Sequence, residues 1–282
     1  MDRTTEASND ALFAQKASAL QQQLASLDGA IVAFSAGVDS TMLLHACVRA
    51  LGERAVAVTA DSPSLPRAEL AEAVALAREL GVRHVVLATH ELERPDYQKN
   101  AADRCYHCKK ELFVTVAQRR SEVAPASWSV VYGAIMDDLG DHRPGQKAAQ
   151  EHGVKAPLID AGFYKTDVRR YSRENGLRTA DKPSFACLSS RVPHGTAIDR
   201  SLLMRIERSE QVLRDLGFRQ FRVRHHGDLA RLELGPDELK AAVAAGDALV
   251  RGIRAAGYTH VTLDLLGYRQ GSWHEENSRG PA

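Results

Sequence analysis

The chain has 282 residues, of which 44% are hydrophobic, and a formal net charge of +1. This length suits one large domain or two modest ones, and the hydrophobic content excludes a disordered chain. The near-neutral charge gives no support to a broad nucleic-acid surface, so nucleic acid is not an expected partner. No stretch approaches the roughly 20 apolar residues that span a bilayer. The N-terminal segment is polar and lacks the apolar run typical of a signal peptide, and four cysteines are too few for a secreted disulfide scaffold. We therefore expect a cytoplasmic protein that does not bind membranes.

Short apolar runs alternate with helix-like segments over the first two thirds of the chain. The runs lack polar alternation, which is typical of strands buried on both faces. Strand–helix repetition of this kind predicts an α/β fold with a doubly wound parallel sheet, in a domain of residues 1–197. The polar segment before Leu27 is expected to form a helix on the outside. The apolar runs are at 30–34, 55–60, 83–89, 129–135 and 156–160, and the clearest helices at 41–51 and 66–80.

A different pattern begins near Asp199. It predicts an amphipathic helix that closes at Gly217, two short strands around a turn at Gly227, a helical segment divided near Gly246, and a last strand. This order predicts a smaller α+β domain of residues 198–282. Its last residues, 269–282, are expected to be a disordered tail.

The segment Ser35–Thr41 joins the first expected strand to a helix and has the composition of a phosphate-binding loop. Gly37 allows close backbone approach, and a helix N-terminus points its N–H groups at an anion. Asp39 can orient the loop or hold Mg2+. No Walker lysine is present, and a simple capped turn is the alternative. We assign nucleotide binding to Ser35, Gly37, Val38, Asp39, Ser40 and Thr41.

Cysteines form the second distinctive feature. Cys105 and Cys108 make a Cys-x-x-Cys pair, which can bind a metal, carry redox chemistry or be inert. Two thiolates are too few for a closed tetrahedral site, and Cys187 is the candidate third ligand. Cys47 falls on the apolar face of a helix and is expected in the core.

Two groups of residues carry a family resemblance. The loop resembles the PP-loop of ATP pyrophosphatases, usually Ser-Gly-Gly-x-Asp-Ser, with Ala36 in place of the first Gly. Cys-Tyr-His-Cys-Lys-Lys (105–110) and Lys-Pro-Ser-x-Ala-Cys-Leu-x-Ser-Arg (182–191) resemble the LarE family of ATP-dependent sulfur transferases. Segments 133–138 and 222–227 support the match, which runs from about residue 20 to 270.

The resemblance implies a reaction. These enzymes adenylate a carboxylate of a pyridinium dicarboxylate mononucleotide with ATP and release pyrophosphate; sulfur then displaces AMP and leaves a thiocarboxylate for the nickel-pincer cofactor. It implies ATP and Mg2+ as cofactors, a homo-oligomer (commonly a hexamer), and catalytic roles for Asp39 and Cys187. Asp61 and Ser62 fall where the superfamily holds adenosine. Arg191, Arg222 and Arg224 are candidate contacts for the mononucleotide phosphate or the adenylate, because a guanidinium donates two parallel hydrogen bonds. Solvated charges on strand and loop surfaces are the alternative for each.

Two sulfur donors are known in the family. Single-cysteine members give up the sulfur of the cysteine that matches Cys187. Other members use three cysteines that hold a 4Fe-4S cluster, and Cys105, Cys108 and Cys187 favour that version. The sacrificial cysteine, structural zinc and unliganded thiols remain open.

Several residues and functions keep more than one interpretation. Asp137 and Asp138 can bind Mg2+ or cap a turn. Three histidines are expected to be structural and three glutamates to lie on solvated faces: His107, His225, His226, Glu207, Glu210 and Glu233. A PP-loop tRNA thiolase is the rival enzyme, and a nucleotide-binding assembly protein without chemistry is the non-enzymatic alternative.

Overall fold

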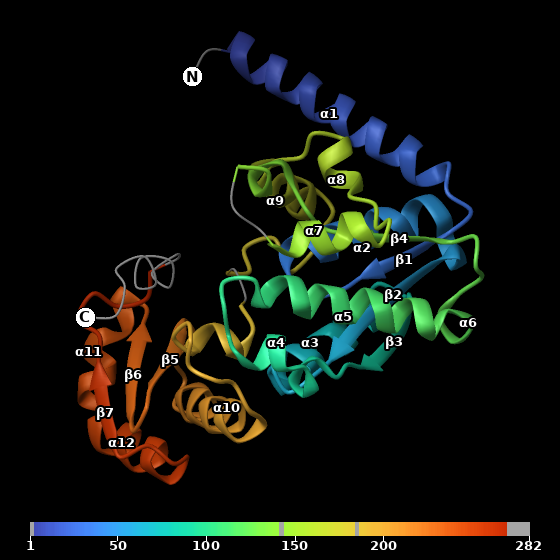
Figure 1. Ribbon diagram of the computed structural model, residues 1–282. Coiled ribbons are helices and arrows are strands. Elements are labelled where there is room, and N and C mark those ends of the chain that lie inside the picture. Colours follow the sequence, from blue (N-terminus) through green and yellow to red (C-terminus); the bar gives the residue numbers. More distant parts are fainter. Residues whose placement is uncertain (1–2, 141–143, 184–185, 270–282) are drawn as a thin grey trace. The chain divides into compact units, whose positions relative to one another are not determined.

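The computed structural model describes residues 3–140, 144–183 and 186–269. Contacts group the chain into two compact units, which we describe separately (Figure 1). The larger unit contains residues 1–61, 67–90 and 105–185, and the smaller contains 62–66, 91–104 and 186–282. The smaller unit therefore includes residues 186–197, which precede the domain boundary expected from the sequence.

A four-stranded parallel sheet forms the centre of the larger unit, with the strand order β3-β2-β1-β4. Ala30 of β1 pairs with Ala55 of β2 on one side and with Ser129 of β4 on the other. All three pairings are parallel, as expected from apolar runs without polar alternation. The strands are β1 (Ala30–Ala33), β2 (Ala55–Asp61), β3 (Arg83–Ala88) and β4 (Ser129–Tyr132).

Helices cover both faces of this sheet. Successive side chains of a strand point to opposite faces, and accordingly Ile31 belongs to a different hydrophobic cluster from its neighbours Ala30 and Val32. This confirms the predicted α/β fold. The α-helices that lie wholly or mostly in this unit are α1 (Arg3–Ala25), α2 (Val38–Leu51), α3 (Arg67–Glu79), α5 (Arg104–Gln118), α6 (Arg120–Val123), α7 (Pro144–Glu151), α8 (Pro157–Asp160) and α9 (Lys165–Glu174).

One expected strand is wrong. The run 156–160 forms α8, a single helical turn, and the nearest sheet contact is an isolated bridge between Val131 and Lys155. Pro157 occupies the first turn of α8, where its fixed φ suits a helix and its missing N–H costs nothing. The run 129–135 also ends early as a strand, at Tyr132.

The smaller unit has a three-stranded sheet with the order β5-β6-β7. β5 (Phe221–His226) and β6 (Leu229–Leu234) are antiparallel around Gly227, whose φ of 63° suits glycine. β7 (His260–Leu263) is parallel to β6. The helices are α4 (Pro95–Gln98), α10 (Arg200–Asp215), α11 (Leu239–Ala244) and α12 (Gly246–Ala255). The predicted helix, hairpin, divided helix and last strand are confirmed.

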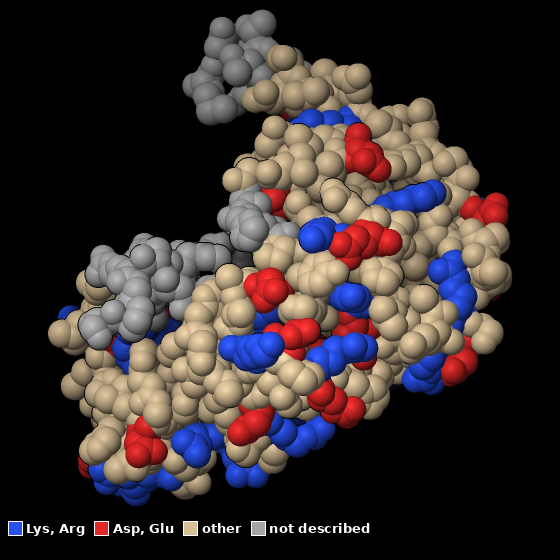
Figure 2. All heavy atoms as spheres, in the orientation of Figure 1, with Lys and Arg blue, Asp and Glu red and all other residues tan. Residues whose placement is uncertain are grey.

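Charges of both signs are interspersed on the face shown in Figure 2, in agreement with the near-zero net charge. In the described part of the chain, no helix has both the length and the apolar character needed to cross a membrane. The expected tail, 269–282, lies almost entirely outside the described residues.

Candidate active site

The loop Ser35–Thr41 follows β1 and leads into α2, which has 14 residues and begins at Val38. The first N–H groups of a helix have no partner within the helix, so this end of α2 favours an anion. Gly37 is the N-cap residue, with φ −79° and ψ 164°, an extended conformation open to any residue. Glycine at this position therefore reflects space in the loop and not backbone conformation.

Hydroxyl groups hold the loop in shape. Ser40 Oγ lies 3.1 Å from Ser35 Oγ and donates to the Gly37 carbonyl oxygen at 3.2 Å. Ser35 N donates to Ser40 Oγ at 3.3 Å. Ser35 is exposed, whereas Thr41 is fully buried and its hydroxyl has no hydrogen-bond partner among the described residues. Ser35 is thus the hydroxyl that the loop presents to solvent.

Ala36 has a left-handed backbone conformation, with φ 56°. Glycine adopts this conformation without strain, while a residue with a Cβ adopts it at a cost of about 1–2 kcal/mol. This explains why the PP-loop pattern has glycine here. The methyl group of Ala36 is fully buried within a hydrophobic cluster of the larger unit.

Asp39 forms an ion pair that the sequence did not indicate. Lys165 Nζ lies 2.7 Å from each carboxylate oxygen of Asp39. Burial raises the pKa of Asp39 above its ordinary value, and the charge and hydrogen bond of Lys165 oppose that rise. Lys165 begins α9, where Asp137 Oδ2 accepts a hydrogen bond from its backbone N at 2.8 Å. Two acidic residues therefore fix this lysine at the loop.

Asp138 acts as a cap. Its Oδ2 accepts a hydrogen bond from Ile135 N at 3.0 Å and closes the 3-10 turn Met136–Asp138. Of the two interpretations left open for Asp137 and Asp138, the structure shows the capping contacts. A magnesium role for either remains a prediction.

A second lysine contacts the loop from the segment that precedes Cys187. Lys182 Nζ donates to the Ala36 carbonyl oxygen at 3.1 Å and to Glu69 at 2.8 Å. Both partners belong to the larger unit. The lysine of the Lys-Pro-Ser segment therefore orients the backbone of the phosphate loop.

Gly133, directly after β4, packs against the first turn of α2. A Cβ built on Gly133 would lie 3.0 Å from the carbonyl carbon of Asp39 and 3.0 Å from Ser40 N. Both neighbours are backbone atoms, which cannot move aside as a side-chain tip can. The glycine therefore sets how closely β4 approaches the phosphate loop.

The two residues expected at adenosine fall in different units. Asp61 ends β2 in the larger unit and pairs with Arg67 at 2.6 Å. Ser62 belongs to the smaller unit, is buried, and has its Oγ 2.7 Å from Ser64 Oγ. Adenosine binding by Asp61 and Ser62 stays a prediction.

The cysteines differ in exposure. Cys105 is exposed and Cys108 is half-buried; both lie in the first turns of α5, three residues apart and hence on one side of the helix. Cys187 is half-buried in the smaller unit, immediately before the 3-10 turn Leu188–Arg191.

Cys47 is fully buried, and burial raises the pKa of its thiol to about 12, which confirms its place in the core. Within each unit taken separately, the described residues contain no group of three or more His, Cys, Asp or Glu side chains able to hold a metal.

Arg191 braces the backbone around Cys187. Its Nη1 donates to the Cys187 carbonyl oxygen at 2.9 Å and also to that of Ala186. Its Nε pairs with Glu210 Oε1 at 2.8 Å, and its side chain is only 1% exposed. The phosphate contact expected of Arg191 remains a prediction, and it would require these contacts to open.

Glu210 and Glu233 are not on solvated faces, contrary to expectation. Glu210 is 4% exposed and pairs with Arg191; Glu233 is 1% exposed and pairs with Arg224 at 2.9 Å. Burial alone would raise the pKa of Glu210, but the adjacent Arg191 charge holds it below its ordinary value. The sequence did not indicate this burial, because Arg191 and Arg224 lie on other elements than the glutamates with which they pair; Arg231, a second partner of Glu233 at 3.0 Å, lies on the same strand.

The other two candidate arginines, Arg222 and Arg224, lie on β5. Arg224 Nη1 donates to the Ser190 carbonyl oxygen at 2.8 Å. Arg222 is half-buried, and this burial lowers the pKa of its guanidinium below the ordinary value. Their phosphate roles stay predictions. His225 is buried beside Tyr258, with Nδ1 3.1 Å from the hydroxyl, as expected of a structural histidine.

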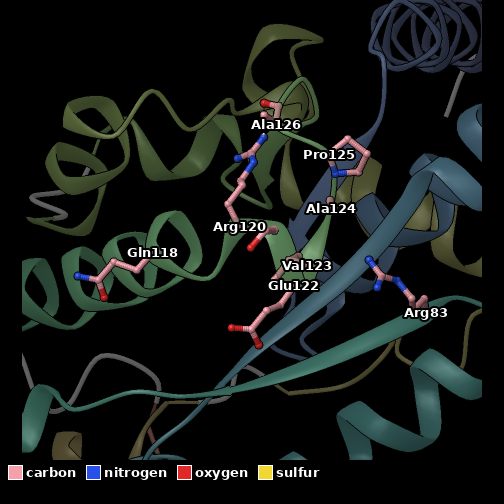
Figure 3. Close-up of a pocket in the computed structure, with 9 residues that line it drawn as sticks. Arg83, Gln118, Arg120, Glu122, Val123, Ala124, Pro125 and Ala126 are labelled. Atoms are coloured by element: carbon pink, nitrogen blue, oxygen red, sulfur yellow. Dashed lines mark hydrogen bonds between the residues drawn. The ribbon is translucent and has the colours of Figure 1, made fainter.

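A shallow hollow of the larger unit lies elsewhere (Figure 3). Arg83 lines it at the start of β3, together with the chain from α6 to Ala126 that leads into β4. These are amino ends of parallel strands, whereas the phosphate loop follows the carboxyl end of β1. Ligands of open α/β sheets gather at carboxyl ends, so we do not assign the hollow to the site.

A parallel four-stranded sheet flanked by helices, with the loop Ser35–Thr41 between its central strand β1 and α2, defines an α/β protein with a fold of the PP-loop type. Comparison with protein-family models gives no match. The chain is 35% identical to the pyridinium-3,5-bisthiocarboxylic acid mononucleotide synthase of Lactiplantibacillus plantarum, over 94% of this chain and 96% of that protein. An uncharacterized Synechocystis protein is 42% identical over 89% of this chain and 94% of its own length. A Methanocaldococcus jannaschii protein is 26% identical over 85% of this chain and 90% of its own length.

The chain therefore belongs to the LarE family, which includes that synthase. The resemblance read from the loop and the cysteine motifs is confirmed at the level of the family.

Proposed function

We propose that this protein is an ATP-dependent sulfur transferase that converts a carboxylate of pyridinium-3,5-biscarboxylic acid mononucleotide to a thiocarboxylate. The observation that carries the proposal is the 35% identity to the bisthiocarboxylic acid mononucleotide synthase over nearly the whole of both chains. The loop Ser35–Thr41 supports it, because an anion site at a helix N-terminus suits a polyphosphate.

The first step activates the carboxylate. The loop residues hold the β- and γ-phosphates of ATP, so the substrate carboxylate oxygen attacks the α-phosphorus and pyrophosphate leaves. Asp39 would hold Mg2+, and the ion would neutralise phosphate charge. Lys165 is the cation already beside Asp39, and we assign it to the same phosphates. The product is an acyl-adenylate, in which AMP is a good leaving group.

The second step brings in sulfur, which attacks the acyl carbon and displaces AMP. We propose a three-cysteine 4Fe-4S cluster as the sulfur donor. The proposal is supported by the accessibility of the thiols: Cys105 is exposed and Cys108 half-buried on one side of α5, and Cys187 is half-buried in a braced loop. Cys47 is excluded by its burial. Cys105, Cys108 and Cys187 would hold such a cluster, which would have one iron without a cysteine ligand and would supply sulfide as the nucleophile. Cys187 as a sacrificial donor is the alternative, since its half-buried thiol is equally accessible to an acyl-adenylate.

Iron and acid-labile sulfide content of anaerobically reconstituted protein tests the donor. We expect close to four irons per chain in wild type and loss of most iron in Cys105→Ala, Cys108→Ala and Cys187→Ala. Cys47→Ala is the matched control and should keep its iron. Iron-free protein that makes one thiocarboxylate and loses the mass of hydrogen sulfide at Cys187 would establish the sacrificial route instead.

Product analysis tests the substrate. Pyrophosphate, AMP and thiocarboxylate should form in equal amounts with the pyridinium mononucleotide. Thiolated nucleosides formed from tRNA would favour the rival thiolase, and no pyrophosphate with either substrate would favour a nucleotide-binding assembly protein. Light scattering tests the proposed homo-oligomer, a hexamer by family resemblance.

A further inference from the structure

In the larger unit, the chain that follows α9 is fastened to α3 by ion pairs. Arg178 pairs with Glu72 at 2.7 Å and with Glu79 at 2.8 Å. Lys182 pairs with Glu69 at 2.8 Å. The three glutamates lie on one side of α3, because they are three and seven positions apart. The arginine is 45% exposed, whereas the side chains of Lys182 and Glu69 are only 19% and 18% exposed, so the lysine is the more firmly enclosed of the two cations.

α9 holds the same piece of chain by its backbone. Arg169 Nη2 donates to the Lys182 carbonyl oxygen at 3.3 Å, and its Nη1 donates to the Ala180 carbonyl oxygen. Arg169 stands one helical turn after Lys165, the residue that pairs with Asp39, so both cations are on the same side of α9. The backbone of Lys182 is therefore fixed at the place from which its side chain reaches the phosphate loop.

The ammonium group of Lys182 lies beside a strained part of that loop. It donates to the carbonyl oxygen of Ala36 at 3.1 Å, and Ala36 has the left-handed φ of 56° that disfavours a residue with a Cβ. The described residues contain no cis peptide, and a trans peptide directs its C=O and its N–H to opposite sides. Because the Ala36 carbonyl faces Lys182, the N–H of Gly37 is directed away from that ammonium group.

We infer that Lys182 is a positioning residue that holds the peptide between Ala36 and Gly37 with its N–H directed at the β- and γ-phosphates of ATP. The inference rests on the proposed function, in which this loop holds those phosphates. A carbonyl oxygen turned toward a phosphate would repel it, so the orientation of this one peptide decides whether the loop presents a donor or an acceptor. Lys182 acts through the backbone of the loop and does not itself touch the nucleotide.

Calorimetric titration of Lys182→Met with ATP and with AMP, in the absence of the carboxylate substrate, tests the inference. Without the ammonium group we expect Ala36 to relax and the following peptide to rotate. The Kd for ATP should rise about tenfold, the size expected for one lost hydrogen bond to a charged group. The Kd for AMP should stay at the wild-type value, because AMP has no β- or γ-phosphate. Lys182→Arg keeps a charged donor and should recover most of the ATP affinity.

Arg178→Met is the matched control. It removes two ion pairs with α3, but both hydrogen-bond partners of Arg178 are on that helix and neither is on the loop. Wild-type affinity for both nucleotides in Arg178→Met, with a selective loss of ATP affinity in Lys182→Met, supports the inference. If Lys182→Met does not fold, Lys182→Gln, whose side chain is polar and one bond shorter, replaces it with the same expected result.

The Ala36→Gly background shows whether the lysine acts through the backbone. Glycine adopts the left-handed conformation without strain, so the peptide needs less support from Lys182 there. Adding Lys182→Met to Ala36→Gly should raise the Kd for ATP only about threefold or less, in place of about tenfold. The full tenfold loss in this background would show that Lys182 binds the nucleotide directly, and would overturn the positioning role.

The remaining outcomes separate the inference from the proposed function. Wild-type ATP affinity in Lys182→Met would overturn the role of Lys182 and leave the nucleotide site intact. Equal weakening of ATP and AMP, or the same loss in Arg178→Met, would show a general loosening of the larger unit and would also overturn it. Wild-type protein that binds no ATP would contradict the proposed function, and the inference with it.

Discussion

Lys165 Nζ lies between the two carboxylate oxygens of Asp39, 2.7 Å from each, although 126 positions separate the residues in the sequence. In the proposed reaction, we expect Lys165 to turn from the carboxylate of Asp39 to the phosphates of ATP when the nucleotide binds. The ion pair thus compensates the half-buried carboxylate of Asp39 in the absence of nucleotide.

Lys165→Ala should therefore slow pyrophosphate release about 10- to 100-fold, a loss of about 1.4–2.7 kcal/mol of transition-state stabilisation. Lys16→Ala is the matched control, because Lys16 forms an ion pair of the same length, 2.7 Å, with Asp167 of the same helix, α9. Initial rates of pyrophosphate release at saturating substrate, with melting temperatures, separate the two. Equal effects of Lys16→Ala and Lys165→Ala on rate would show that Lys165 is only structural.

The parts of the fold set by local pattern could be predicted from the sequence. The four parallel strands follow from apolar runs without alternation, and the hairpin follows from Gly227 between two alternating strands. The strand predicted at 156–160 was wrong, because a short apolar run does not distinguish a strand from a helical turn. Pro157, at the first turn of α8, was the signal that could have corrected it.

The contacts of the site could not be predicted, because they join residues that are distant in the chain. Lys165 has no motif of its own, and its importance comes only from Asp39. Glu210 reads as one more charge on an amphipathic helix until Arg191 is seen beside it. The sequence identified the loop Ser35–Thr41 and the cysteines as candidate site residues, but not the side chains that orient them.

Gly37→Ala should impair nucleotide binding without unfolding the protein. The backbone at Gly37 is extended, and the closest atom to a new Cβ would be Ser35 Oγ, at 3.4 Å. The added methyl group would instead occupy space beside the backbone N–H groups that we expect to bind phosphate. We expect an unchanged melting temperature and at least about a tenfold rise in the Kd for ATP, measured by calorimetry, or about 1.4 kcal/mol. A large drop in melting temperature would contradict this account.

Ala36→Gly tests the left-handed backbone of the loop. Glycine would relieve about 1–2 kcal/mol of strain at φ 56°. The lost buried methyl group opposes this by about 0.8 kcal/mol, and the greater freedom of unfolded glycine adds a further cost. We expect a change in unfolding free energy within about 1 kcal/mol and retained ATP binding. Ala36→Val, which is β-branched, should be clearly destabilised in the same denaturant titrations; a Val variant as stable as wild type would refute the assigned conformation.

Gly133→Ala should disturb the phosphate loop from the side of β4. Its Cβ would meet the backbone of Asp39 and Ser40 at 3.0 Å, so strand or loop must shift, at a cost of about 1–3 kcal/mol. The expected result is a lower melting temperature together with slower pyrophosphate release. Gly246→Ala is the control, because a Cβ added at Gly246 would meet no atom within 4 Å. An undisturbed Gly133→Ala enzyme would show that the strand does not set the loop position.

Acid should weaken the smaller unit through the Glu210–Arg191 pair. The pKa of Glu210 is held below its ordinary 4.5, so the pair's stabilisation is fully present above about that pH and is lost as pH falls through the lower, folded-state pKa. Glu210→Gln leaves the buried Arg191 without its carboxylate, which should cost about 3–5 kcal/mol near neutral pH. The gap in melting temperature between wild type and Glu210→Gln should therefore narrow below pH 4.5.

Asp215→Asn, on the exposed face of the same helix, should have the same melting temperature as wild type across that range. A difference in melting temperature that stays constant from pH 7 to pH 3 would show that Glu210 does not stabilise the protein through its ionised pair with Arg191.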